Sequence, residues 1–182
     1  MEIASFTEQY QFAKKHYKEW IPRKDASENV YIKFLDDVIK RPDWKILMST
    51  ATEYLNTGVD LYNDGSFQES ISCFTASWQS FPSIKAFHSL TLAHGSLGNF
   101  VNGLSLSVNS LELSLHLNDT IFLRDIYLKR GMMVAEILAK SNQLNKHNDD
   151  LIVFAMKNLQ EAQHLGDPEA YSLIRQLMSM SK

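Results

Sequence analysis

Residues 51–84, ATEYLNTGVDLYNDGSFQESISCFTASWQSFPSI, decide the fold of this chain. Apolar residues recur at three- and four-residue intervals on both sides of Gly65, a spacing typical of amphipathic helices and not of strands. Gly65 adopts a left-handed conformation without strain, so the chain can reverse there, and Pro82 ends the second helix. The stretch therefore predicts two antiparallel helices joined by a short turn.

Small side chains lie where these two helices have to cross. Helix backbones approach closely only if small residues lie at the crossing and larger residues fill the space beside it. Gly58 in the first helix and Ser70 in the second helix meet that requirement. We therefore expect Gly58 and Ser70 at the crossing and Gly65 in the turn.

A second unit with the same turn follows at residues 84–117. Its turn glycine, Gly98, lies 33 residues after Gly65, and each glycine precedes a phenylalanine by two positions. Gly103 is the small residue expected at the crossing of this second unit. Such repetition indicates a repeat protein, in which successive units stack. We expect a third, longer unit at residues 120–166 and a capping helix at residues 168–180.

These units resemble the tetratricopeptide repeat (TPR) family. In the first unit the matching residues are Tyr54, Gly58, Leu61, Tyr62, Gly65, Phe67, Ile71, Phe74 and Pro82, with Ser70 and Ser77 at the usual alanine positions. The end of the third unit, residues 155–170, is also similar to the Sel1-type repeat. The resemblance implies an all-α, TPR-like α-solenoid of about three helical hairpins, with N-terminal helices and a C-terminal capping helix.

Residues 1–50 are expected to form a helical segment that packs on the repeats, which occupy residues 51–182. Its first helix carries a stripe of apolar residues, Phe6, Tyr10, Ala13, Tyr17 and Trp20. A second helix is expected after Ser27, which can cap it, with an inward face of Val30, Tyr31, Phe34, Leu35 and Val38. A third helix begins near Asp43 and continues into the first repeat helix, because no breaker intervenes.

Composition excludes several classes of function. The chain of 182 residues is 45% hydrophobic and 21% charged, with a net charge of -3 and no long run of Lys or Arg, so we expect no nucleic-acid partner. No stretch of 18 apolar residues predicts a membrane span, and no secretory signal is evident. The single cysteine, Cys73, fits a reducing, cytoplasmic compartment and a role in filling the core.

Chemistry-bearing motifs are absent from the sequence. The histidines, His16, His88, His94, His116, His147 and His164, lack zinc-ligand spacing, so we expect no metal. The acidic pairs Asp36–Asp37 and Asp149–Asp150 fit solvated helix residues or a helix cap. No phosphate-binding loop or nucleophile elbow occurs. We therefore expect no catalytic residues, no cofactor and no enzymatic activity.

The resemblance also implies a concave groove lined by the first helix of each repeat. The residues that it places there are Leu55, Val59, Tyr62, Lys85, His88, Leu92, Leu128 and Met132. An apolar groove favours an extended or helical apolar segment of a partner protein. Alternatively, the chain's own N-terminal helices bury these residues.

The leading hypothesis is a non-catalytic peptide- or protein-binding adaptor or chaperone. Over about residues 25–165 the plan is similar to class II chaperones of bacterial type III secretion, which hold a translocator segment in a groove. An alternative is an inhibitory interaction protein that blocks a partner through its convex face or the loop at residues 141–150, and a third is an unrecognised enzyme. The aromatic stripe is expected to pack on the repeats or on a second copy, giving a homodimer.

Overall fold

The computed structural model describes residues 4–23, 29–141 and 150–180. Within these ranges every regular element is helical, which confirms the predicted all-α class. The elements are α1 (Phe6–His16), a 3-10 helix η1 (Tyr17–Trp20), α2 (Val30–Val38), α3 (Trp44–Asn63), α4 (Phe67–Ser80), α5 (Ile84–Ser96), α6 (Phe100–His116), α7 (Thr120–Lys140), α8 (Asp150–His164) and α9 (Pro168–Met180).

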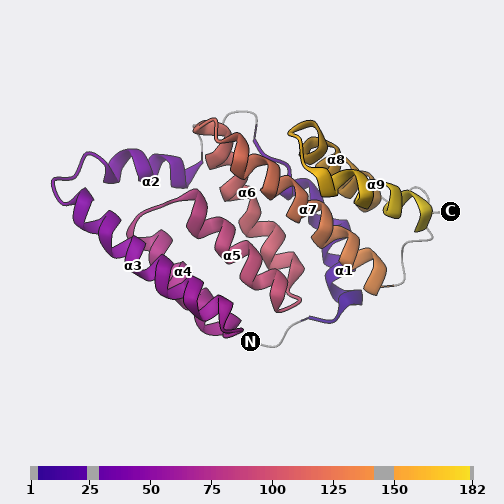
Figure 1. Cartoon of the computed structure of the whole chain (residues 1–182), viewed down its shortest axis with the longest axis horizontal. Helices are drawn as coiled ribbons and strands as arrows, with labels where there is room; N and C mark the ends of the chain where they lie inside the picture. The colour runs from indigo at the N-terminus through magenta and orange to yellow at the C-terminus, as the bar shows by residue number, and fades with distance from the viewer. Residues whose placement is uncertain (1–3, 24–28, 142–149, 181–182) are drawn as a thin grey trace.

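Consecutive helices pack as antiparallel pairs. The three pairs are α3–α4, α5–α6 and α7–α8, and neighbouring pairs contact each other through α4 with α5 and α6 with α7. Figure 1 shows the pairs following one another along the molecule, with α9 packed on α8 at the far end. Each amphipathic helix thereby buries its apolar face against the next one, as a row of hairpins requires.

Small residues lie at the crossings within the pairs. A Cβ atom added to Gly58 would lie 2.5 Å from Cε1 of Phe74, so only glycine allows α3 to approach α4 this closely. Ser70 is fully buried in α4. In the third pair Gly131 has the same role, because an added Cβ would lie 2.6 Å from Cγ of Leu159.

Left-handed residues reverse the chain between helices. Gly65 and Gly98 have φ of +79° and +74°, and in both turns the following amide donates to a carbonyl five residues earlier at 2.9 Å. Asn118, between α6 and α7, has the same type of turn with φ of 54°. The amides that follow these residues thereby donate to carbonyl groups that the helix ends would otherwise leave unpaired.

Two expectations about helix faces are wrong. The α2 helix begins at Val30 and is capped by Asn29, whose side chain accepts from the amide of Tyr31, while Ser27 lies outside the described residues. Because Val30 is the first helical residue, it is 67% exposed, and Ile32 is buried in its place. In α9, Ala170, Ile174 and Leu177 are buried, but Tyr171 is 54% exposed because it follows Ala170 on the outward side.

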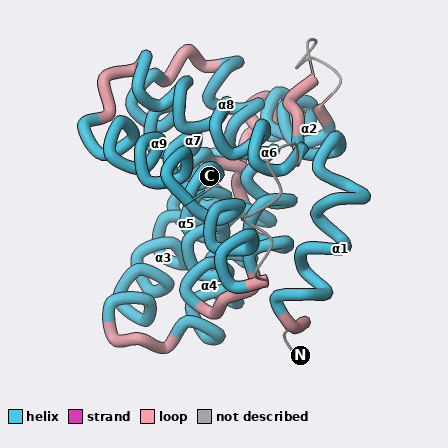
Figure 2. The backbone as a smooth tube through the Cα atoms, turned by 90° about the vertical axis from the view of Figure 1, so that its right-hand side faces the viewer, coloured by secondary structure: helices cyan, strands magenta, loops and turns pink. Residues whose placement is uncertain are grey.

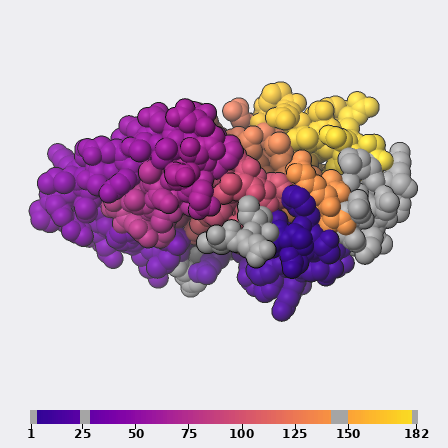
Figure 3. All heavy atoms as spheres, turned by 90° about the horizontal axis from the view of Figure 1, so that it is seen from below, coloured from indigo at the N-terminus to yellow at the C-terminus, as the bar shows by residue number. Residues whose placement is uncertain are grey.

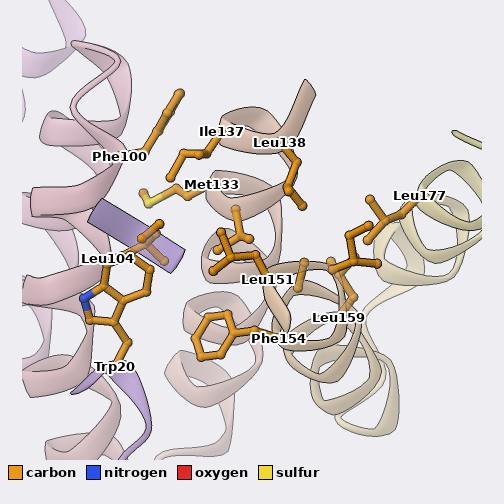
Figure 4. Packing of buried hydrophobic residues seen from close by; sticks show 14 of the residues in the cluster. Trp20, Phe100, Leu104, Met133, Ile137, Leu138, Leu151, Phe154, Leu159 and Leu177 are labelled. Atoms are coloured by element: carbon orange, nitrogen blue, oxygen red, sulfur yellow. The ribbon is translucent and has the colours of Figure 1, made fainter. Parts of the chain in front are cut away.

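The N-terminal segment, which comprises α1 and η1, packs on the last two helix pairs. α1 contacts α6, α7 and α8, with Tyr10, Ala13 and Trp20 buried in the main apolar core. Figure 4 shows Trp20 facing Leu104 and Phe154 in this core. The stripe thus packs on its own chain, and Figure 2 shows α1 and α2 on one side of the molecule and α3 and α9 on the other.

A buried arginine joins the N-terminal segment to two helix pairs through hydrogen bonds. Arg130 of α7 is 1% exposed and donates from Nε to the side-chain oxygen of Asn158 at 2.9 Å. It also donates to Ser107 Oγ of α6 and to the backbone carbonyl of Trp20. Burial lowers the pKa of Arg130 to about 10, so the guanidinium remains charged at neutral pH.

None of the helices in the described ranges combines the length and the apolar character that a membrane crossing requires. This agrees with the sequence-based expectation of no membrane span. The loop predicted at residues 141–150 lies almost entirely outside the described residues, since only Ser141 and Asp150 of it are described.

Candidate functional site

Three cavities follow the first helices of the pairs. The first, of about 190 Å³, is lined by Val59, Tyr62, Phe74, Ser89 and Leu92. The second, of about 240 Å³, is lined by Tyr62, Leu92, Gly95, Ser96, Phe100, Lys129, Met132, Met133 and Glu136. The third, of about 130 Å³, is lined by Met132, Ala135, Glu136, Ala139, Leu159, Leu173, Gln176 and Leu177.

These cavities form one continuous surface. The first and second share Tyr62 and Leu92, and the second and third share Met132 and Glu136. The surface runs from α3 across α5 and α7 to α9, and we call it the α3–α9 groove. The described residues that line the three cavities include none from α1, η1 or α2. The described N-terminal helices therefore leave the groove uncovered.

The floor of the groove combines fixed and adaptable side chains. The hydroxyl of Tyr62 lies 2.8 Å from Ser96 Oγ, a hydrogen bond that joins α3 to α5. Gly95 leaves room for Met133, because an added Cβ would lie 2.9 Å from its methyl carbon. Methionine side chains adjust to differently shaped apolar ligands. The centre of the groove is therefore apolar and adaptable, beside a tyrosine held in place.

Two charged residues line the groove beside its apolar side chains. Lys129 and Glu136, both of α7, line the second cavity. Glu136 is exposed and pairs with Lys140 at 3.2 Å. An apolar ligand would therefore desolvate few charged groups, which keeps the cost of binding low.

The structure places four of the eight predicted groove residues on this surface. Val59, Tyr62, Leu92 and Met132 line its cavities. Lys85 is exposed on α5 but lines none of these three cavities, and half-buried Leu55 packs on the core cluster around Phe74.

The other two predicted groove residues are buried. Leu128 is 4% exposed in the main core, because it lies three residues before Gly131 on the face of α7 that packs on α8. His88 is 7% exposed, and its Nε2 lies 2.6 Å from Oδ2 of Asp125. The hydrogen bond from His88 is the main cause of a lowered pKa for Asp125. His88 therefore links α5 to α7 and is not available to a ligand.

Several groove residues were not predicted from the sequence. Gly95 and Glu136 lie one helical turn after the predicted positions Leu92 and Met132, so the 3.6-residue period would have found them, whereas Met133 directly follows Met132. Leu173 and Leu177 come from α9, which was predicted only as a cap. Their part in the groove depends on how α9 packs on α7 and α8, and no local pattern signals that.

Within the described ranges, no cluster of three or more His, Cys, Asp or Glu residues has the arrangement needed to hold a metal ion. Cys73 is half-buried. Comparison with protein-family models, with curated proteins and with solved structures finds no match for this chain.

Proposed function

We propose that the chain is a non-catalytic adaptor or chaperone that holds an apolar segment of a partner protein in the α3–α9 groove. The observation that carries the proposal is the continuity of the groove across four helices, with an apolar floor that α1 and α2 leave uncovered. A row of apolar hollows that continues from one helix to the next suits the apolar side chains of a partner segment.

We also propose that the fold is a TPR-like α-solenoid of three hairpins with α9 as its cap. Two features support this assignment: the turns at Gly65 and Gly98 have the same conformation, and glycines occupy the crossings at Gly58 and Gly131. In such an array the first helices of the hairpins form the concave binding surface. The groove lies along those helices, α3, α5 and α7.

The chemistry of the groove favours a partner segment with two or more large apolar side chains. Leu92 lies between the first two cavities and Met132 between the last two, so each contacts the ligand at two points. A helical or extended peptide presents apolar side chains on one face at regular spacing, which suits a row of shallow cavities. Lys129 and Glu136 would select the charges beside that face.

The test uses peptides selected from a random phage-displayed library against the full chain. We expect the selected peptides to be rich in large apolar residues and to bind Leu92→Asp at least roughly tenfold more weakly, because a carboxylate would then be buried against them. Leu115→Asp is the matched control, since Leu115 is 39% exposed on α6 and lies outside the groove. Equal binding by both variants, with unchanged circular dichroism, would show that the ligand lies elsewhere.

A further inference from the structure

A fourth cavity lies on the other side of the helix pairs. It has a volume of about 420 Å³ and lies between α4, the end of α5 and the first half of α6, a site that we call the α4–α6 cleft. Its lining residues are Gln68, Ile71, His94, Leu97, Asn99, Asn102, Ser105 and Leu106. The cleft thus combines three apolar side chains with five polar ones, and binding sites combine both kinds.

The next cleft along the same side is filled by α1. This helix packs against α6, α7 and α8, which are the counterparts, one pair later, of α4, α5 and α6. Gln68 and Ile71 of the α4–α6 cleft correspond, at the 33-residue offset of the two turns, to Val101 and Leu104. Both counterparts pack in the core that contains the buried residues of α1. In Figure 3, α1 (indigo) lies against the orange residues of α7.

A glutamine holds α1 at the start of α6. The side chain of Gln9 donates to the carbonyl of Gly98 at 2.9 Å and accepts from the amide of Phe100 at 2.9 Å. The turn at Gly65 has the same conformation and the same hydrogen bond to a carbonyl five residues earlier. The start of α4 therefore presents equivalent backbone groups at Gly65 and Phe67.

The α4–α6 cleft also adjoins the surface that binds the N-terminal segment. Ser105, which lines the cleft, accepts a hydrogen bond from the indole of Trp20 at 3.2 Å. His94 Nδ1 is a buried atom with no hydrogen-bond partner among the described residues. A ligand in the cleft would thus extend an existing interface.

We propose that the α4–α6 cleft binds an amphipathic helix of a partner protein, with an apolar face like that of α1 and a glutamine placed to bond Gly65 and Phe67. The α1 helix supplies the precedent, because it packs at the corresponding position of the next helix pair through the corresponding groups, Gly98 and Phe100. This site lies on the second helices of the pairs, and it does not depend on the α3–α9 groove.

The probe is a labelled peptide of residues 4–20, ASFTEQYQFAKKHYKEW, added to the full chain and followed by fluorescence anisotropy. We expect saturable binding that Asn102→Trp weakens at least tenfold, because an indole at this exposed position fills the cleft. Asn56→Trp, an exposed position on α3 outside the cleft, should bind as the wild-type chain does. A peptide with Gln9→Leu should bind more weakly, by roughly five- to tenfold, after the loss of its carboxamide.

Three outcomes would overturn the proposal. The first is the absence of saturable binding to the wild-type chain. The second is equal binding by Asn102→Trp, which would mean that the peptide displaces the chain's own α1. The third is loss of binding in Leu92→Asp, which would place the peptide in the α3–α9 groove. Retained binding in Leu92→Asp also separates this site from the proposed adaptor function.

Discussion

The guanidinium of Arg130 donates a hydrogen bond to the backbone carbonyl of Trp20, a residue 110 positions earlier in the chain. Its other nitrogens bond Asn158 and Ser107, so one side chain holds the N-terminal segment, α6 and α8 together. All of these groups are buried, and each acceptor would lose its partner if the arginine were removed. Arg130 therefore stabilises the packing of these three segments on α7.

We expect Arg130→Ala to lower the free energy of unfolding by on the order of 3 kcal/mol, since it leaves unpaired buried acceptors and a cavity. Urea denaturation followed by tryptophan fluorescence measures this loss. The matched control is Arg175→Ala on the exposed face of α9, for which we expect a change within about 0.5 kcal/mol. Similar values for the two variants would contradict the role of Arg130.

Gly58 is constrained by Phe74 and not by its own backbone conformation. We expect Gly58→Ala to destabilise the chain by about 1–3 kcal/mol, because the new methyl group overlaps the Phe74 ring and outweighs the gain in helix propensity. The variant with Phe74→Leu in addition should lose less than the sum of the two single changes, which a double-mutant cycle by thermal denaturation measures. Strict additivity would mean that the two residues do not interact.

Asn118 adopts a left-handed conformation that glycine adopts more easily. We expect Asn118→Gly to stabilise the chain by a few tenths of a kcal/mol, whereas Asn118→Ala should cost about 1 kcal/mol. Asn118 is exposed, so neither variant changes the core. Denaturant titration of both variants tests this order, and a more stable alanine variant would contradict it.

Stability should depend on pH through Asp125. Its pKa is lowered in the folded state, chiefly by the hydrogen bond from His88, so ionised Asp125 stabilises the fold above its unfolded pKa of about 3.9. As the pH falls below that value towards the lowered folded pKa, the contribution is lost. The stability difference between wild type and Asp125→Asn should therefore shrink from pH 7 to pH 3 in urea titrations. Exposed Asp60→Asn is the control, and an equal change in both variants would contradict the prediction.

Helix bounds could be predicted closely because caps and turns are local. The sequence alone placed α3 as one helix running into the first repeat, and it placed the ends of α7, α8 and α9 to within about two residues. Gly65 and Gly98 carry that information themselves, since few other residues adopt positive φ without strain. The start of α2 was less accurate, because both Ser27 and Asn29 have the chemistry of a cap.

The predicted groove residues lie partly on the α3–α9 groove and partly elsewhere in the structure. Val59, Tyr62 and Leu92 follow from the first two units, whereas Leu128 was misplaced because the third unit is longer and its crossing glycine, Gly131, was not recognised. The partners of Arg130 and the pairing of His88 with Asp125 join residues far apart in the sequence. No periodicity encodes such contacts, so they require the three-dimensional packing.

The packing of α1 against α6, α7 and α8 has a consequence for folding during translation. At roughly 5–20 residues per second, Trp20 leaves the ribosome on the order of 10 s before Arg130 is synthesised. During that interval α3 and α4 have the residues that they need to pair with each other, whereas the aromatic side chains of α1 and η1 lack the helices α7 and α8 on which they pack. The α1 helix therefore packs only after helices that follow it in the chain, and until then a nascent chain exposes Tyr10 and Trp20 to solvent and to chaperones.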